Sequence, residues 1–170
     1  CTASHASVEA MLRLVEKHAV TAADVELIEA DLKPYPLVRQ NPKRGFEGRF
    51  SMPFCLANAL VYRRLRPNDF SDRRLQEPAI AGLIDRCRHI ADAPSLIVVL
   101  RNGSRLDEPL LVPSDLKGWD QTVAKFRDSV GTLLTDVQQC TIIESVQAIQ
   151  KLPSIRDITQ ALQQTKRNEN

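Results

Sequence analysis

His5 lies between small and hydroxyl residues in the opening segment CTASHASVEAMLRL. The apolar residues from Val8 to Ala19 recur every three or four positions, which predicts a helix with Ser4 or Ser7 available as its N-cap. His5 would then lie at the positive end of the helix dipole, where a neutral imidazole can accept a proton or hydrogen-bond a carboxylate. The alternative is a solvent-facing histidine at a helix start, because one histidine without a visible acid or nucleophile partner is not a catalytic set.

Basic residues are concentrated in the middle of the chain. Residues 39–88 hold eleven Lys or Arg against five Asp or Glu, although the net charge of the whole chain is only +2. Arg63, Arg64 and Arg66 could form a patch for phosphate or a polycarboxylate. No aromatic residues are interleaved with these arginines and no nucleic-acid motif accompanies them, so we do not expect nucleic-acid binding. A solvated basic face is the alternative.

The segment SMPFCLANALVYRRL predicts a buried helix. Ser51 is a good N-cap, Pro53 is tolerated in a first turn, and the residues that follow are apolar on nearly every side. The four cysteines form no CxxC pair and no Cys/His cluster, so no metal site or redox pair is expected. Cys55 and Cys87 have apolar neighbours and are expected in the core.

The rest of the chain alternates between strand and helix patterns. Strands are predicted at 25–32, 87–93 and 95–101, with a loop at 37–49 and a hairpin through Asn102-Gly103 to 105–112. Helices are predicted at 73–86 with a break at Pro78, and then at 119–134, 137–150 and 154–164. The fold class is therefore α+β, a small sheet with a β-hairpin covered by helices and followed by C-terminal helices.

Length and hydropathy place this chain among ordinary globular proteins. With 170 residues it fits one domain, or one domain with a helical appendage. Its longest apolar run, residues 54–62, contains Asn58 and is too short to span a bilayer. No secretory segment is visible, so we expect a cytoplasmic or mitochondrial location without a membrane partner.

Several of these segments together resemble a known family. They are CTASHASVEAMLRLVEKHAVTAADVELIEADL, NPKRGFEGRFSMPFCLANALVYRRLRPNDFSD, the strand-Asn-Gly-strand unit and the later AKFRDSVGTLL helix. In this order they resemble the C-terminal part of the MmgE/PrpD family, which contains 2-methylcitrate dehydratase, cis-aconitate decarboxylase and iminodisuccinate epimerase. The resemblance covers nearly the whole chain.

The resemblance implies a cofactor-independent enzyme with a large helical domain, a smaller α/β lid domain and an active site between them. Residues 1–118 would be the lid. Residues 119–164 would be helices that pack on the lid, on a helical domain or on a partner, and residues 165–170 would be a frayed tail. The implied reaction is dehydration, decarboxylation or epimerisation of a small di- or tricarboxylate, by proton transfer next to a carboxylate and without a metal.

The resemblance also assigns candidate site residues. The family's Cys-x-x-x-His segment matches residues 1–5, which makes His5 the acid/base or substrate-orienting group. The Phe-Ser-x-Pro segment matches residues 50–53, so that Ser51 and Arg49 are substrate contacts or, alternatively, a cap and a surface charge. Arg44 would assist Arg49 in binding carboxylates.

The family's other active-site groups belong to its helical domain and match nothing in this sequence. We therefore expect a lid that is incomplete without a helical domain, supplied by the same longer chain or by a separate subunit. The alternative is a non-catalytic binding or assembly module that pairs with another chain, with homo-oligomerisation a natural outcome. The apolar helix faces that would associate are Val123, Phe126, Val130, Leu133 and Leu134, and Ile142, Ile143, Val146 and Ile149.

Overall fold

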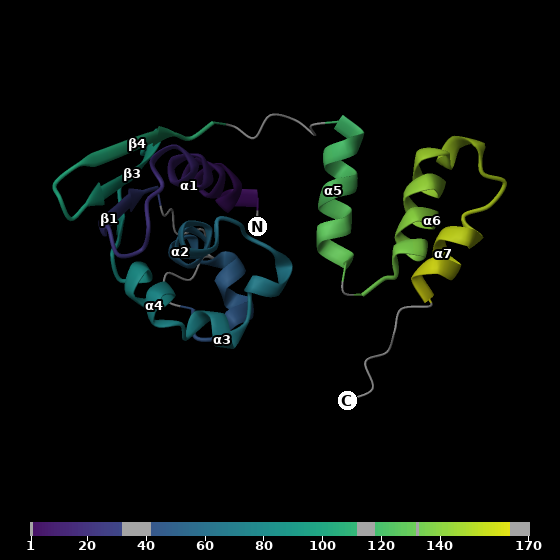
Figure 1. The fold of residues 1–170 in the computed structure, drawn as a ribbon, viewed down its shortest axis with the longest axis horizontal. Helices are drawn as coiled ribbons and strands as arrows, with labels where there is room; N and C mark the ends of the chain where they lie inside the picture. The colour runs from purple at the N-terminus through teal and green to yellow at the C-terminus, as the bar shows by residue number, and fades with distance from the viewer. Residues whose placement is uncertain (1, 32–41, 112–117, 132, 164–170) are drawn as a thin grey trace. The chain divides into compact units, whose positions relative to one another are not determined.

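A computed structural model describes residues 2–31, 42–111, 118–131 and 133–163 of the chain. The chain divides into two compact units, residues 1–114 and 115–170, and each is described by itself. The first unit contains a sheet and helices, and the second contains helices within its described residues (Figure 1). The predicted α+β class is confirmed.

Four strands form the sheet of the first unit. They are β1 (Val25–Ala30), β2 (Cys87–His89), β3 (Ser95–Leu100) and β4 (Arg105–Pro109), in the order β2-β1-β3-β4. β1 and β2 are parallel, and the other two pairs are antiparallel. The predicted Asn-Gly hairpin is confirmed between β3 and β4, where Gly103 has the positive φ of 83° that such a turn favours.

Helices fill the connections of the first unit. They are α1 (His5–His18), α2 (Met52–Tyr62), α3 (Asp72–Leu75) and α4 (Pro78–Ile84), with 3-10 turns η1 (Thr2–Ser4), η2 (Gly45–Phe50) and η3 (Pro67–Asp69). The predicted break at Pro78 separates α3 from α4, because proline begins a helix readily and interrupts one badly.

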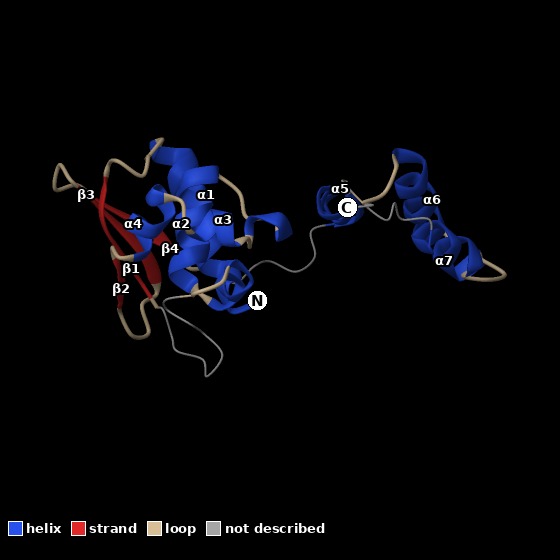
Figure 2. Ribbon diagram, turned by 90° about the horizontal axis from the view of Figure 1, so that it is seen from below, coloured by secondary structure: helices blue, strands red, loops and turns tan. Residues whose placement is uncertain are grey.

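In the first unit the helices pack against the sheet, and the core lies between these two layers (Figure 2). On β3, Leu96 and Val98 are fully buried while Ile97 and Val99 are half-buried, as the period of two requires. α2 contributes Phe54 and Leu56, both fully buried. Its almost uniformly apolar sequence is explained by its position, since α1, α4 and η2 all contact it.

Two buried glutamates lie on the sheet and have different partners. Glu108 of β4 accepts hydrogen bonds from Arg13 Nε and Lys17 Nζ of α1, both at 2.7 Å. Glu29 of β1 pairs with Arg88 of β2 and, at 3.1 Å, with Arg105 of β4. Ion pairs therefore join β2 to β1, β4 to β1 across the intervening β3, and β4 to α1.

The second unit contains α5 (Gly118–Val130), α6 (Asp136–Gln147) and α7 (Arg156–Gln163), with the 3-10 turn η4 (Ile149–Lys151) after α6. Its small core consists of Leu134, Ile142 and Ala161, with Phe126 and Val130 packed against them. Thr135 caps α6, accepting a hydrogen bond from the Gln138 backbone N–H at 3.3 Å. The three C-terminal helices predicted from the sequence are confirmed.

Some predicted boundaries differ from the structure. β2 has only three residues instead of seven, and residues 45–50, predicted as part of a loop, form η2. Residues 32–41, 112–117 and the predicted tail at 165–170 lie outside the described residues. Among the helices that the structure describes, none is both long and apolar enough to cross a bilayer.

Candidate functional site

His5 is the first residue of α1, and its side chain is exposed. Ser4 occupies the N-cap position, but its backbone is helical and its side chain makes no capping hydrogen bond. Ser7 is buried inside the helix. The predicted N-cap position of Ser4 is therefore confirmed but its capping hydrogen bond is not, because η1 leads directly into α1 and continues the helical turn through Ser4.

Ser4 and Cys55, a residue of α2, are both buried. The Cys55 thiol donates to the carbonyl oxygen of Gly48, with Sγ 3.5 Å from that oxygen. Burial raises the pKa of Cys55 to about 11. The thiol therefore stays protonated at neutral pH and remains a donor.

The turn η2 carries the two candidate arginines. Arg44 is its N-cap residue and Arg49 lies in its last turn. The Glu47 carboxylate accepts hydrogen bonds from the backbone N–H groups of Lys43 and Arg44, at 2.9 and 3.4 Å. This carboxylate satisfies donors at the start of the turn and fixes the backbone on which both arginines are mounted.

A second anchor joins η2 to α3. The Gly45 N–H donates to Asp72 Oδ1 at 2.6 Å. A Cβ at Gly45 would lie 2.0 Å from the Ser71 carbonyl carbon, so only glycine permits this approach.

Both arginine side chains are exposed and lie near aromatic rings. The Arg49 guanidinium carbon is 5.9 Å from the centre of the Phe70 ring, and that of Arg44 is 5.8 Å from the centre of the Phe46 ring. Such contacts restrict a guanidinium while leaving its N–H groups available to a carboxylate.

Ser51 performs the structural role that the sequence predicted. It is 1% exposed, and its hydroxyl oxygen accepts a hydrogen bond from the Phe54 N–H at 3.3 Å at the N-cap of α2. A direct contact between Ser51 and substrate stays a prediction.

The arginines after α2 have separate contacts. Arg63 Nη1 donates to the Val15 carbonyl at 3.2 Å and so caps the end of α1, and the Arg66 N–H donates to Asp69 Oδ2 at 2.7 Å. Arg63, Arg64 and Arg66 are all exposed, and their predicted role toward an anionic partner stays a prediction. Within the described part of the chain, no three His, Cys, Asp or Glu side chains gather as metal ligands would.

A family model, the MmgE/PrpD C-terminal domain, matches residues 1–151. The chain belongs to the MmgE/PrpD family. The match begins before His5 and includes η2, Ser51 and α2, and so covers every candidate site residue. No curated protein sequence matches the chain.

Membership makes this MmgE/PrpD domain the lid portion of a dehydratase- or epimerase-like enzyme at the level of the family. α7 lies beyond the matched residues.

Sequence reasoning placed Cys55 in the core of the MmgE/PrpD domain, and it is buried there. It missed that this thiol donates to the carbonyl of Gly48, the residue before Arg49.

Proposed function

We propose that this domain closes over a small di- or tricarboxylate and takes part in proton transfer at the carbon next to a carboxylate. The observation that supports the proposal most directly is the family match across the segments of His5 and Arg49. Arg49, assisted by Arg44, would bind a carboxylate through paired N–H groups, and His5 would donate or accept the proton. The remaining acid/base groups would come from a helical domain, in the same longer chain or in a separate subunit.

His5 is tested by substitution in the full natural polypeptide that contains this chain. With cis-aconitate and 2-methylcitrate as trial substrates, His5→Gln is expected to lower kcat by about 10²- to 10⁴-fold, the usual contribution of a positioned acid or base. His18→Gln is the matched control, because His18 is also exposed and lies at the other end of α1. Equal loss in both variants would contradict the role of His5.

Arg49 is tested through substrate affinity. Arg49→Gln is expected to raise KM by about 10- to 100-fold, since a hydrogen-bonded charge pair is lost. Arg73→Gln serves as the control, because Arg73 is equally exposed but lies on α3. An unchanged KM in Arg49→Gln would remove Arg49 from the binding site.

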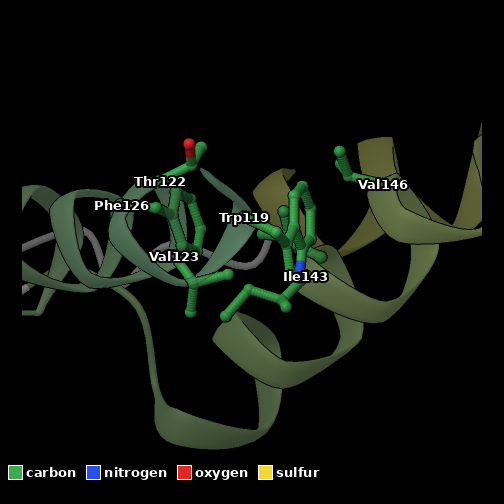
Figure 3. A pocket seen from close by; sticks show the side chains of 7 residues that line it. Trp119, Thr122, Val123, Phe126, Ile143 and Val146 are labelled. Carbon is green, nitrogen blue, oxygen red and sulfur yellow. The ribbon is translucent and has the colours of Figure 1, made fainter. Parts of the chain in front are cut away.

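A second candidate function, association with another chain, is favoured by an apolar groove in the second unit. The groove has a volume of about 110 Å³, and Figure 3 shows side chains of α5 and α6 around it. Its lining residues are Trp119, Thr122, Val123, Phe126, Ile142, Ile143 and Val146. No residue of α5 is fully buried, and Val123, Phe126 and Val130 on its apolar face are only partly covered among the described residues.

Association is tested with two valines of α6. Val146 lines the groove, whereas Val137 is 76% exposed and lies outside the lining. If the groove binds a second copy or a helical subunit, Val146→Glu is expected to weaken the complex in analytical ultracentrifugation, and Val137→Glu is not. A monomer at all concentrations, with no subunit copurifying, would reject the association function.

A further inference from the structure

Residues 70–72, which lead from η3 into α3, contact both ends of η2. At the start of the turn, Asp72 accepts a hydrogen bond from the Gly45 N–H, with 2.6 Å between Oδ1 and the nitrogen. At the end of the turn, the Arg49 guanidinium carbon lies 5.9 Å from the centre of the Phe70 ring. Phe70 and Asp72 are two positions apart, so one short stretch of backbone sets both contacts.

The contact at Gly45 fixes the start of η2 closely. A Cβ at Gly45 would lie 2.0 Å from the Ser71 carbonyl carbon and 2.4 Å from the Asp72 nitrogen, so the two backbones touch. The acceptor of the Gly45 N–H is a carboxylate, and hydrogen bonds to a charged group are shorter and stronger than neutral ones. Asp72 therefore sets both the distance and the direction of the turn.

Residues 70–72 are themselves braced by their neighbours. The Asp69 carboxylate is 3.0 Å from Arg74 Nη2, and the Ser71 hydroxyl oxygen accepts a hydrogen bond from the Arg74 N–H at 3.3 Å. The Arg74 guanidinium carbon lies 3.5 Å from the centre of the Tyr62 ring, at the end of α2. The segment that carries Asp72 is thus attached to α2 and provides η2 with a fixed support.

The Phe70 ring is half-buried and also packs on α2. Its centre is 6.0 Å from that of the Phe54 ring, which is fully buried. The Phe54 ring also lies against Gly48, where an added Cβ would be 2.6 Å from it. Phe70 therefore presents a fixed aromatic surface to Arg49, whose side chain stays exposed.

We propose that Asp72 is a positioning residue, which holds η2 where the Arg49 guanidinium lies over the Phe70 ring and can bind a carboxylate. The inference rests on the proposed function. A guanidinium pairs with a carboxylate through two parallel N–H groups, so a displaced turn weakens the pair. Asp72 acts through the Gly45 backbone, because its own negative charge would repel a carboxylate substrate.

The activity test compares Asp72→Ala with Asp72→Asn in the full natural polypeptide. Alanine removes the acceptor of the Gly45 N–H, whereas asparagine keeps a side-chain carbonyl at the same position. Asp72→Ala is expected to raise KM about three- to tenfold and to change kcat by less than about twofold, because binding lost equally from substrate and transition state is seen in KM. Asp72→Asn is expected to restore most of the affinity.

Arg49→Gln provides the background that shows whether Asp72 acts through Arg49. In that background, Asp72→Ala is expected to raise KM by less than about twofold, since the side chain that it positions is already gone. Asp85→Ala is the matched control, because Asp85 is also an exposed aspartate at the end of a short helix, α4. It should leave KM unchanged.

A second measurement does not depend on turnover. In hydrogen–deuterium exchange, Asp72→Ala is expected to raise the exchange rates of residues 45–51 by about tenfold, the effect of losing one hydrogen bond to a charged group. Asp72→Asn should raise these rates less. The amides of β3 should be unchanged, and Asp85→Ala should leave residues 45–51 protected.

The two measurements separate the hypotheses. If the wild type turns over neither cis-aconitate nor 2-methylcitrate, the proposed function fails, and the exchange rates still decide whether Asp72 holds η2. Unchanged exchange at residues 45–51 in Asp72→Ala, or an equal rise throughout the domain, would overturn the positioning role. A wild-type KM in Asp72→Ala would overturn it too, as would the same rise in KM with and without Arg49.

Discussion

At the residue scale, Glu108 shows how a carboxylate is retained in a core. It is 4% exposed on the face of β4 that α1 covers. Hydrogen bonds from Lys17 and Arg13 hold its pKa below the ordinary value of 4.5, against the opposing effect of burial. Burial alone would favour the neutral acid, so the two α1 cations decide its ionisation.

Glu108→Gln is expected to destabilise the domain by about 1–3 kcal/mol at pH 7, because two buried cationic donors lose their charged acceptor. Because the pKa of Glu108 is lowered in the folded state, its carboxylate stabilises the fold fully at pH values above the unfolded-state pKa. This stabilisation is lost as the pH falls through the folded-state pKa. The difference between wild type and variant, measured by urea unfolding, should be constant above pH 5.5 or so and shrink in acid.

Glu26→Gln is the control for this pH dependence, because Glu26 is exposed on β1. It should leave the free energy of unfolding nearly unchanged. A difference between wild type and Glu108→Gln that grows in acid would contradict the stabilising role of the ionised form.

At the scale of elements, η2 is held by the start of α3 and the start of α2. Gly45 contacts the backbone of Ser71 and Asp72, and Gly48 contacts the Phe54 ring. These contacts make the turn a packed element, although its sequence of glycines and charges is typical of a loop. The arginines are therefore mounted on an ordered support.

Gly45→Ala is expected to destabilise the domain by more than about 2 kcal/mol, because the new Cβ would overlap the Ser71 carbonyl carbon and the backbone must shift. Gly82→Ala is the matched change. Gly82 lies in α4 with nothing within 4 Å of the added Cβ, and alanine should stabilise this helix by about 0.5–1 kcal/mol. Urea unfolding measures both, and destabilisation of equal size would refute the close packing of η2.

Ser51→Ala is expected to cost about 1 kcal/mol, because the buried Phe54 N–H loses its acceptor at the start of α2. Ser71→Ala removes a cap of the same 3.3 Å geometry from α3, which has only four residues and no buried side chain, so its cost should be smaller. Thermal unfolding compares the two. A larger loss in Ser71→Ala would mean that Ser51 is not the more important cap.

At the scale of the whole molecule, the residues that the structure describes form two hydrophobic clusters. The first joins α1, α2 and α4 to the sheet, and the second joins α6 and α7 with Phe126 and Val130 of α5. The second is small. Ten large hydrophobic residues are exposed among those described, and seven of them lie in the second unit. These seven are Trp119, Leu133, Val137, Val146, Ile149, Ile155 and Leu162.

Ile142→Ala is expected to destabilise the second unit by about 2 kcal/mol or more, because it removes a central side chain of the small cluster. The amides of α6 and α7 should lose protection in hydrogen exchange while those of β3 keep theirs. Leu56→Ala, in the core of the first unit, should lower the protection of the β3 amides and leave that of α6 and α7 unchanged. Equal loss of protection in both units would show that the two clusters unfold as one.

The sequence by itself determined the fold class, the hairpin and the helices, because hydrophobic period, Asn-Gly and proline signals are local. It also determined family membership and the cap at Ser51. The tertiary structure decided that residues 45–50 form a packed 3-10 turn. The turn depends on contacts of Gly45 with Ser71 and Asp72, about 27 residues further along the chain, and its local pattern of glycines and charges carries no information about such partners.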